Sequence, residues 1–437
     1  MDVFRANFFG AGQQVPSDQK IFLQRSPLSQ IHSDQKKTVM QDQITRLLPG
    51  VPSVESPFFS HIFSDPSIDD EIRRIAHDLN QNGFAVLDFP DDDFDRIADS
   101  IKVALNENFP WQDWLDFGFE KNNGLRAINA WKFDENVKRL ATNARIIEIL
   151  TTLFGRQAWP FQTLNFPVGT QQHVHTDSVH FSSVPERFMC GVWTALEDIS
   201  ADAGPLVYYP GSHKWPIFTN EHIGACSAEE KSELNQNAYE PLWRALIDVH
   251  EIKPVTFTPK KGQSLIWLAN LLHGGNRQTN KQKTRWSQVT HYYFEGCAYH
   301  SPMHSDPFYG AISFRNLSNI ITGEQVKHQY CGHDIDETFI AAAKDRVGSK
   351  KVPLPADFDP EQYLLANRDL REANVDPVYH YRHYGISEGR PLTPLPEGFD
   401  DEQYLNANPD VRAANIDAAA HYRNYGKSEG RPLRPAE

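Results

Sequence analysis

A series of short, strand-like runs between residues 158 and 294 constrains the fold of this chain most strongly. The runs are rich in β-branched and aromatic residues, and turn signals such as Ala203-Gly204-Pro205 separate them. We expect strands at residues 158–166, 171–181, 188–196, 206–209, 255–258, 264–268 and 286–294. Many short strands of this kind predict a mainly β protein with flanking helices, built on a two-sheet double-stranded β-helix, a cupin-like jelly roll. Such a core leaves a roomy mouth between its sheets.

A helical stretch precedes these strands. Apolar residues recur at helical spacing over 68–81, where Ile72, Ile75 and Leu79 share a face, and 83–89 is typical of a buried strand. A further helix is expected over about 137–154, ending at Gly155. Residues 228–249 predict a helical insertion between two of the strands.

Changes in composition divide the chain. With 437 residues it exceeds one ordinary core, so we expect one large domain with appended segments. Residues 1–66, rich in Gln, Ser, Asp and Pro, predict an N-terminal arm. The jelly-roll domain is expected at 67–346, a linker at 347–357 and a small α-helical repeat module at 358–437.

The C-terminal segment contains an internal repeat. Residues 358–392 match 399–433 at a constant offset of 41 positions, and 24 of the 35 aligned positions are identical. Each copy predicts short helices with an aspartate cap and a glycine end. The Tyr and His residues that recur in both copies are more typical of helix packing than of a metal site.

Charge and cysteine usage limit the classes of function. A formal net charge of −14 argues against a general binder of nucleic acids or anionic membranes, because both need a positive field. No apolar run approaches a membrane span, and the first residues lack the pattern of a secretory signal. The four cysteines show no paired spacing, so we expect a reduced, cytoplasmic setting.

The segment GTQQHVHTDSVHF (169–181) carries the first candidate site. In an extended chain, residues two apart point to the same side, so His175 and Asp177 can grip one ion. His273 directly follows an apolar strand and precedes two glycines, which predicts a strand end where the backbone turns away, and it offers a third ligand. Two imidazoles and one carboxylate form the set that holds non-haem Fe(II) and leaves positions open.

A candidate anion clamp follows twelve residues after His273. Arg285 and Ser287 share one face of the next expected strand. A guanidinium beside a hydroxyl is suited to a dicarboxylate, because its planar fork matches a carboxylate in two parallel charge-assisted bonds. The metal set and the clamp therefore occur in one chain, in an order that suits a shared cavity.

The sequence resembles the phytanoyl-CoA dioxygenase family of Fe(II)- and 2-oxoglutarate-dependent oxygenases over about residues 68–300. The resemblance rests on His175-Thr176-Asp177, the segment GVWTALEDISADAGPLVYYPGSHK (191–214), His273 and Arg285-Trp286-Ser287. It implies that His175, Asp177 and His273 hold iron, and that Arg285 and Ser287 bind the distal carboxylate of the co-substrate. Trp193 and Asn165 match positions that line the co-substrate pocket.

The same resemblance implies an activity. 2-Oxoglutarate and O2 would be consumed to give succinate and CO2, with hydroxylation of a small molecule or a glycan precursor. Related halogenases replace the carboxylate ligand with a small residue, so Asp177 favours hydroxylation. The repeats resemble modules attached to bacterial glycosyltransferases, which indicates that a protein or glycan partner could bind them but does not establish a substrate.

Other readings of the sequence stay open. The chain could be a non-catalytic jelly-roll binder that acts through its repeats in surface-polysaccharide assembly, although a binder has no need for all four of His175, Asp177, His273 and Arg285. An oxygenase with these ligands could also desaturate, epimerise or cyclise its substrate. A zinc hydrolase is disfavoured, because no clear general base lies nearby and Arg285 would have no role.

Four further histidines lie near these motifs. His173 shares a face with His175 and suits a supporting or substrate role, whereas His180 flanks the triplet without matching a ligand position. His213 is expected to fix the turn in PGSHK. His291 lies on the face of Arg285 and Ser287, where it either lines the cavity or is a hydrogen-bonded core residue.

Overall fold

The computed structural model describes residues 47–117, 125–226, 236–347, 354–355, 357–372, 375–386, 388–414 and 416–435. Most of the predicted N-terminal arm (1–46), the start of the predicted insertion (227–235) and most of the predicted linker lie outside the described residues.

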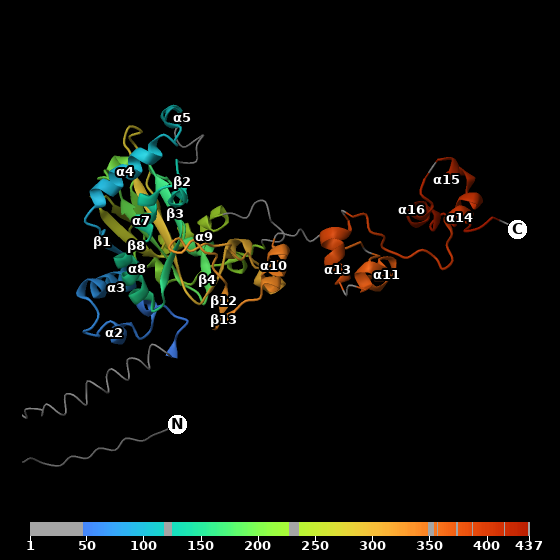
Figure 1. The fold of residues 1–437 in the computed structure, drawn as a ribbon, viewed down its shortest axis with the longest axis horizontal. Coiled ribbons are helices and arrows are strands. Elements are labelled where there is room, and N and C mark those ends of the chain that lie inside the picture. The colour runs from blue at the N-terminus through green and yellow to red at the C-terminus, as the bar shows by residue number, and fades with distance from the viewer. Residues whose placement is uncertain are drawn as a thin grey trace, which may run out of the picture.

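A six-stranded antiparallel sheet forms the centre of the molecule (Figure 1), in the order β1-β8-β5-β10-β3-β2. Its strands are β1 (Phe84–Asp88), β2 (Ala127–Ile128), β3 (Ala158–Phe166), β5 (Met189–Ala195), β8 (Gln263–Leu268) and β10 (Ser287–Phe294). Each matches a predicted strand to within two residues, except for β2, which the sequence did not predict. β10 pairs with both β3 and β5 and is buried along its whole length, so that its polar side chains, such as Ser287 and Gln288, are buried as well.

A smaller antiparallel sheet has the order β7-β6-β9. Its strands are β6 (Leu206–Tyr208), β7 (Val255–Phe257) and β9 (His273–Gly275). A single bridge between His175 and His273 continues this sheet by one more segment of chain. Two short pairs, β4 (Ser182–Val184) with β11 (Ala298–His300) and β12 (Gln329–Tyr330) with β13 (His333–Asp334), complete the strands.

Helices cover one face of the large sheet (Figure 1). They are α3 (Asp70–Asn82), α4 (Phe94–Asn106), α7 (Glu135–Ala141) and α8 (Ala144–Phe154). Phe154 of α8 stacks on Phe294 of β10 with ring centroids 3.9 Å apart, and the Tyr292 hydroxyl donates to the Ala141 carbonyl. Val289 and His291, at alternate positions of β10, therefore point to the opposite face.

The predicted helix at 137–154 is in fact two helices. Asn143 separates α7 from α8, and its side chain accepts hydrogen bonds from the backbone N–H groups of Arg145 and Ile146. Asparagine is a strong N-cap because its short amide competes with the helix for such bonds, so it starts a new helix here instead of continuing the old one.

The predicted strand at 171–181 is also wrong. His175 forms only the bridge to His273, and the 3-10 helix η3 (Asp177–Val179) follows directly. Thr176 between them is extended, with φ −112° and ψ 145°. The side chains of His175 and Asp177 therefore point the same way because the one residue between them is extended and a tight turn follows.

The predicted end of a strand at His273 needs correction as well, because His273 begins β9. Gly274 and Gly275 continue that strand. A Cβ atom at Gly274 would lie 2.9 Å from the Gln172 carbonyl oxygen, and one at Gly275 would lie 2.9 Å from the Gln171 nitrogen. The two glycines therefore let the segment that carries His175 lie close against β9.

Shorter elements surround this core. The described end of the predicted arm contains η1 (Ser53–Glu55) and α2 (Phe59–Ile62), and Arg187 pairs with Glu55 at 2.6 Å. Later in the chain lie α5 (Trp111–Phe117), α9 (Glu240–Val249) from the predicted insertion, and α10 (Glu337–Arg346). No helix among the described residues is long and apolar enough to cross a membrane.

Each C-terminal repeat folds into short helices around its own small core. The first copy has α11 (Pro360–Ala366), α12 (Arg368–Glu372) and α13 (Pro377–His380), and the second has α14 (Asp401–Ala407), α15 (Pro409–Ala413) and α16 (Ala418–His421). Tyr363 bonds to His380, and Tyr404 to His421, both at 2.9 Å. These recurring Tyr and His residues therefore pack and hydrogen-bond within each copy, as their pattern predicted.

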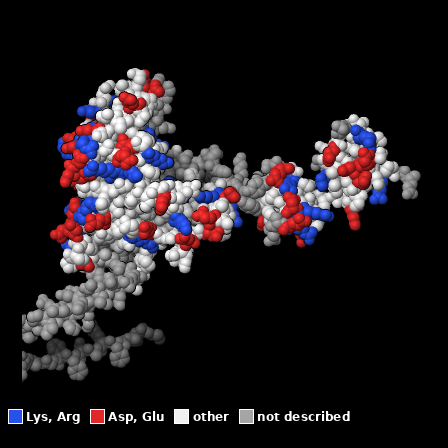
Figure 2. All heavy atoms as spheres, in the orientation of Figure 1, with Lys and Arg blue, Asp and Glu red and all other residues white. Residues whose placement is uncertain are grey.

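Charges of both signs lie interspersed on the face of the molecule shown in Figure 2. No field of a single sign covers that face.

Candidate metal centre

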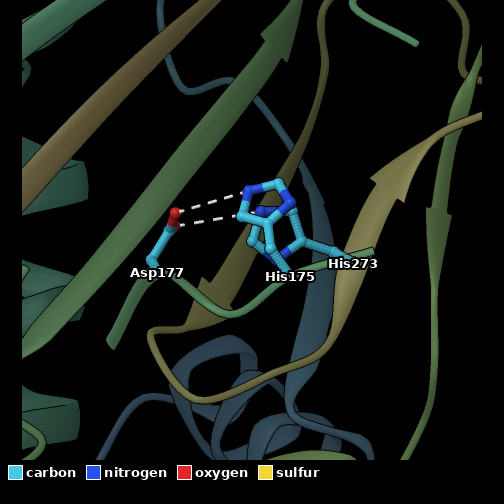
Figure 3. A group of neighbouring side chains, drawn as sticks. All are labelled: His175, Asp177 and His273. Carbon is cyan, nitrogen blue, oxygen red and sulfur yellow. Dashed lines mark ion pairs between the residues drawn. The ribbon is translucent and has the colours of Figure 1, made fainter. Parts of the chain in front are cut away.

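Three buried side chains converge beside the small sheet (Figure 3). One nitrogen each from His175 and His273 and one oxygen of Asp177 all lie within 4.8 Å of one another. Nε2 of His175 is 3.9 Å from Oδ1 of Asp177, and Nε2 of His273 is 3.9 Å from Oδ2. Imidazole nitrogens and a carboxylate oxygen in this arrangement form a donor set that fits a divalent transition metal.

The backbone fixes the two imidazoles relative to each other. His175 and His273 exchange two backbone hydrogen bonds of 2.9 Å, and their ring centroids lie 4.4 Å apart. Nδ1 of His175 is 2.8 Å from the His173 carbonyl oxygen, and Nδ1 of His273 is 3.0 Å from that of Leu271. A ring N–H that donates to these carbonyls leaves Nε2 with a free lone pair toward the site.

Protonation also favours metal binding. Burial, followed by the neighbouring His273, lowers the pKa of His175 to about 3, so this ring is neutral near pH 7. Burial alone would raise the pKa of Asp177, but His273, His291, His175 and the N–H of Trp267 outweigh it, and the pKa lies below its ordinary value. A neutral imidazole and an ionised carboxylate are the forms that coordinate a cation.

The three side chains open into a cavity of about 300 Å³ between the two sheets. The large sheet contributes one wall, through Gln162, Leu164, Phe166, Trp193, Trp267, Val289 and His291. The opposite wall includes Leu206, Tyr208 and His273 of the small sheet. A cavity of this size, with mixed apolar and polar walls, suits a small co-substrate and part of a substrate.

Arg285 lies at another part of this cavity and is fully buried. Its Nη1 donates to the Gly204 carbonyl at 3.3 Å, whereas Nε and Nη2 have no hydrogen-bond partner among the described residues. Burial lowers the pKa of Arg285 to about 10, which still leaves it charged at pH 7. A buried guanidinium with two unsatisfied donors fits a carboxylate, because leaving such groups unpaired is costly.

Ser287 and Trp193 accompany Arg285. Within the part of the chain that the structure describes, the Ser287 hydroxyl and the Trp193 indole nitrogen are buried without a hydrogen-bond partner, and the Arg285 guanidinium lies 5.8 Å from the centre of the Trp193 ring. Ser287 lies on the same face of β10 as Val289, which lines the cavity. Together these groups could bind the distal carboxylate of 2-oxoglutarate.

Asn165 does not lie with them. The residues of β3 that line the cavity are Gln162, Leu164 and Phe166, so Asn165 points to the other face. There its side-chain amide donates to Gln288 at 3.1 Å. The structure thus offers no support for the expected contact between Asn165 and the co-substrate.

Two further side chains of the large sheet lie beside Asp177. His291 has Nε2 3.9 Å from Asp177 Oδ2 and Nδ1 3.1 Å from Oε1 of Gln162, so it both lines the cavity and is hydrogen-bonded, the two roles that its place on the strand predicted. Trp267, which no motif marked, donates to Asp177 Oδ2 at 2.8 Å. Alternation along β8 could have placed Trp267 on the cavity face, but not its contact with Asp177.

Arg126 and Tyr208 are two further cavity residues that were not singled out as site residues. Arg126 is an exposed cation on the cavity lining, whereas Tyr208 is buried there. Tyr208 belongs to the segment 191–214 that carries the family resemblance, but no spacing links either residue to the metal segment.

The other three histidines that lie near the motifs each have a hydrogen-bond partner. His173 is exposed, with Nδ1 2.8 Å from a carboxylate oxygen of Glu240 in α9. His180 lines the cavity, and its Nε2 lies 3.2 Å from Oε1 of Gln236. His213 is buried, with Nε2 3.1 Å from the Asn80 carbonyl oxygen, in keeping with a role in fixing its turn.

Comparison with solved structures finds partial matches at low identity and low TM-score. The carbocyclase SnoK from nogalamycin biosynthesis, described as non-haem and α-ketoglutarate-dependent, is 15% identical, with a TM-score of 0.41; the match covers 60% of this chain and 95% of SnoK. EctD from S. alaskensis, with bound Fe, is 19% identical, with a TM-score of 0.40 and coverage of 54% and 80%. HygX from Streptomyces hygroscopicus, with nickel and 2-oxoglutarate bound, is 16% identical, with a TM-score of 0.35 and coverage of 53% and 88%. No curated protein sequence matches the chain.

Residues 67–286, just over half of the chain, match the family described as phytanoyl-CoA dioxygenase (PhyH). The matched segment contains His175, Asp177, His273 and Arg285, and ends one residue before Ser287. The chain belongs to the phytanoyl-CoA dioxygenase family of Fe(II)- and 2-oxoglutarate-dependent oxygenases.

Proposed function

We propose that the chain hydroxylates a small molecule or glycan precursor, in a jelly-roll core whose two sheets enclose the reaction. The observation that carries this proposal is one cavity that contains both a His-Asp-His cluster and a buried arginine with unsatisfied donors. A metal site alone would suit many functions. The added clamp is what suits a dicarboxylate co-substrate.

In this proposal His175, Asp177 and His273 hold Fe(II). Three protein ligands leave positions free for the co-substrate and O2. When bound, iron and 2-oxoglutarate supply the oxidising chemistry, which yields succinate and CO2 and inserts one oxygen atom into the substrate. Asp177 carries the one negative charge among the three ligands, and so offsets part of the charge of the ion.

Arg285 and Ser287 hold the distal carboxylate in this proposal, and Trp193 forms the wall beside them. The fully buried guanidinium makes charge-assisted bonds in a place that excludes water, where they are strong. Its position fixes the length of the acid that fits between it and the metal ligands. The apolar side chains of Leu164, Phe181 and Val289 line the same cavity and limit the access of water to the reacting groups.

The alternative of a non-catalytic binder explains less. It gives no reason for burying an arginine whose Nε and Nη2 lack partners beside a complete set of metal ligands. We therefore place the catalytic function in the cavity, and no role in binding a partner is assigned to the repeats.

Product analysis under ¹⁸O2 tests the proposal. The purified protein, Fe(II) and 2-oxoglutarate are incubated with a panel of nucleotide sugars, sugar phosphates and small metabolites, and succinate and new masses are measured. We expect one substrate class to increase succinate formation and to gain a single oxygen atom that carries the label. A product that loses two hydrogens, or one of unchanged mass and altered stereochemistry, would replace hydroxylation by desaturation, cyclisation or epimerisation.

A further inference from the structure

Trp267 of β8 contacts the carboxylate of Asp177 directly. Its indole N–H donates to Oδ2 at 2.8 Å, and both residues are at most 5% exposed. The ring also lies beside the imidazoles of His273 and His291, with centroids 5.6 Å and 6.0 Å away. Trp267 is thus a donor inside the cluster that no metal-binding motif contains.

Gly191 of β5 provides the space for this indole. Gly191 and Trp267 are register partners on adjacent strands. A Cβ atom at residue 191 would lie 2.1 Å from Cζ2 and 2.3 Å from Cη2 of the Trp267 ring, closer than any real contact. The φ angle of Gly191 is not among the positive values, so the reason for glycine here is steric.

The hydrogen bond distinguishes the two oxygens of Asp177. Oδ2 accepts the indole N–H, whereas Oδ1 accepts no hydrogen bond from any described residue and faces Nε2 of His175 at 3.9 Å. A carboxylate with one oxygen held by a rigid, buried donor cannot rotate freely about its last bond. Oδ1 is then the oxygen that remains available to a cation.

We propose that Trp267 is a positioning residue that presents Oδ1 of Asp177 to the metal, and that Gly191 is required to seat its indole. This inference rests on the proposed iron site and adds a residue to it. Partners that orient metal ligands in this way typically contribute about 10- to 100-fold in metal affinity. A loss of metal affinity of this size distinguishes a positioning role from a role in packing alone.

The test is anaerobic calorimetric titration of the apo-protein with Fe(II) alone, without 2-oxoglutarate. Trp267→Phe keeps an aromatic ring and removes the N–H, and we expect its affinity for Fe(II) to fall by roughly 10- to 100-fold. Trp159→Phe is the matched control, because Trp159 is a buried tryptophan that packs edge-on against Tyr299 in the core. It should bind Fe(II) as the wild type does.

Gly191→Ala supplies a second test of the same contact. The added methyl group displaces the indole, so Fe(II) affinity should fall in the wild-type background. The smaller ring in Trp267→Phe accommodates the methyl group, so the double variant should be little worse than Trp267→Phe alone. Such non-additivity is expected only if Gly191 acts through residue 267.

The outcomes separate this inference from the proposed function. If Asp177→Ala abolishes Fe(II) binding while Trp267→Phe stays within two-fold of the wild type, the iron site stands and the positioning role is wrong. Equal losses in Trp267→Phe and Trp159→Phe would also overturn it, since they would indicate general destabilisation. A wild type that binds no Fe(II) contradicts both proposals.

Discussion

The two ends of the cavity differ in how their polar atoms are satisfied. At the metal end, each of the three clustered side chains has a hydrogen-bond partner. The partner is the His173 carbonyl for His175, the Leu271 carbonyl for His273 and the Trp267 indole for Asp177. At the Arg285 end, Nε and Nη2 of Arg285 and the Ser287 hydroxyl are buried and have no partner in the described segments of the chain. The protein itself supplies the hydrogen-bond partners at the metal end, whereas the donors at the Arg285 end have no acceptor among the described residues.

This difference indicates two ways of preparing a site. The metal end is preorganised, so that binding an ion does not require its ligands to find new orientations. The Arg285 end contains buried donors without partners, and the free-energy cost of burying them is offset when an anion binds. Removing a group at the metal end should therefore weaken Fe(II) binding, and removing one at the Arg285 end should weaken co-substrate binding while leaving the apo-protein intact.

The largest effect is expected from Asp177→Ala. Loss of the only charged ligand should reduce Fe(II) affinity by more than about 100-fold, beyond the loss seen when a mere supporting partner is removed. Calorimetric titration measures it, with the exposed Asp248→Ala on α9 as control. Fe(II) affinity that stays near the wild-type value would mean that the ion binds elsewhere.

Arg285→Met should give the next largest loss of affinity, and only for the ligand that binds at the Arg285 end of the cavity. We expect 2-oxoglutarate affinity to fall by roughly 100-fold or more, because truncating a buried charge partner costs about 2–5 kcal/mol. Fe(II) affinity should stay unchanged. The thermal midpoint of the apo-protein should hold or rise, since an apolar side chain removes a buried, incompletely paired charge.

Thermal unfolding with and without 2-oxoglutarate provides the measurement for Arg285→Met. The wild type should be stabilised by the co-substrate and the variant should not be. Arg277→Leu, at an exposed arginine, is the control. A large loss of apo stability in Arg285→Met would show that Arg285 holds the fold together instead of waiting for a ligand.

A smaller effect is expected from Ser287→Ala. Loss of one hydroxyl donor should weaken 2-oxoglutarate about five-fold, in line with roughly 0.5–1.5 kcal/mol for one hydrogen bond. Ser264→Ala is a matched control, because its hydroxyl already bonds to Thr194 at 2.9 Å. That control should lower the free energy of unfolding and leave co-substrate affinity unchanged; the reverse pattern would contradict the account.

The smallest effect on binding is expected from Asn165→Ala. Because the side chain points away from the cavity, 2-oxoglutarate affinity should change by less than about two-fold. Urea unfolding should show a loss of about 1 kcal/mol, since Gln288 loses a buried partner. A loss of more than five-fold in co-substrate affinity would restore the role that the family resemblance implied for Asn165.

Strand propensity and turn signals were sufficient to predict the central strands, because β3, β5, β8 and β10 are rich in β-branched and aromatic residues and turn residues separate them. The strand period also placed Arg285 and Ser287 on one face. The tight turn after Thr176 was missed, since a polar segment held by a single bridge to β9 has no period of its own. Likewise, Asn165 was assigned by motif, whereas the pleat of β3 decides which way it points.

The contact between Trp267 and Asp177 lies beyond prediction from a single sequence. The two residues are 90 positions apart, and their meeting depends on the register of β8 against β5 and on the space above Gly191. A tryptophan in an apolar strand is usually a core residue. Only the three-dimensional arrangement reveals that its one polar atom meets a metal ligand.

Anaerobic titration of the apo-protein with Fe(II) and 2-oxoglutarate, followed by visible absorption, reports whether one cavity binds both. We expect a weak metal-to-ligand charge-transfer band only when both are present. The band should be absent in Asp177→Ala and appear in Arg285→Met only at much higher 2-oxoglutarate concentration. A wild type that binds iron but shows no band, and forms no succinate once O2 is admitted, would contradict the proposed function.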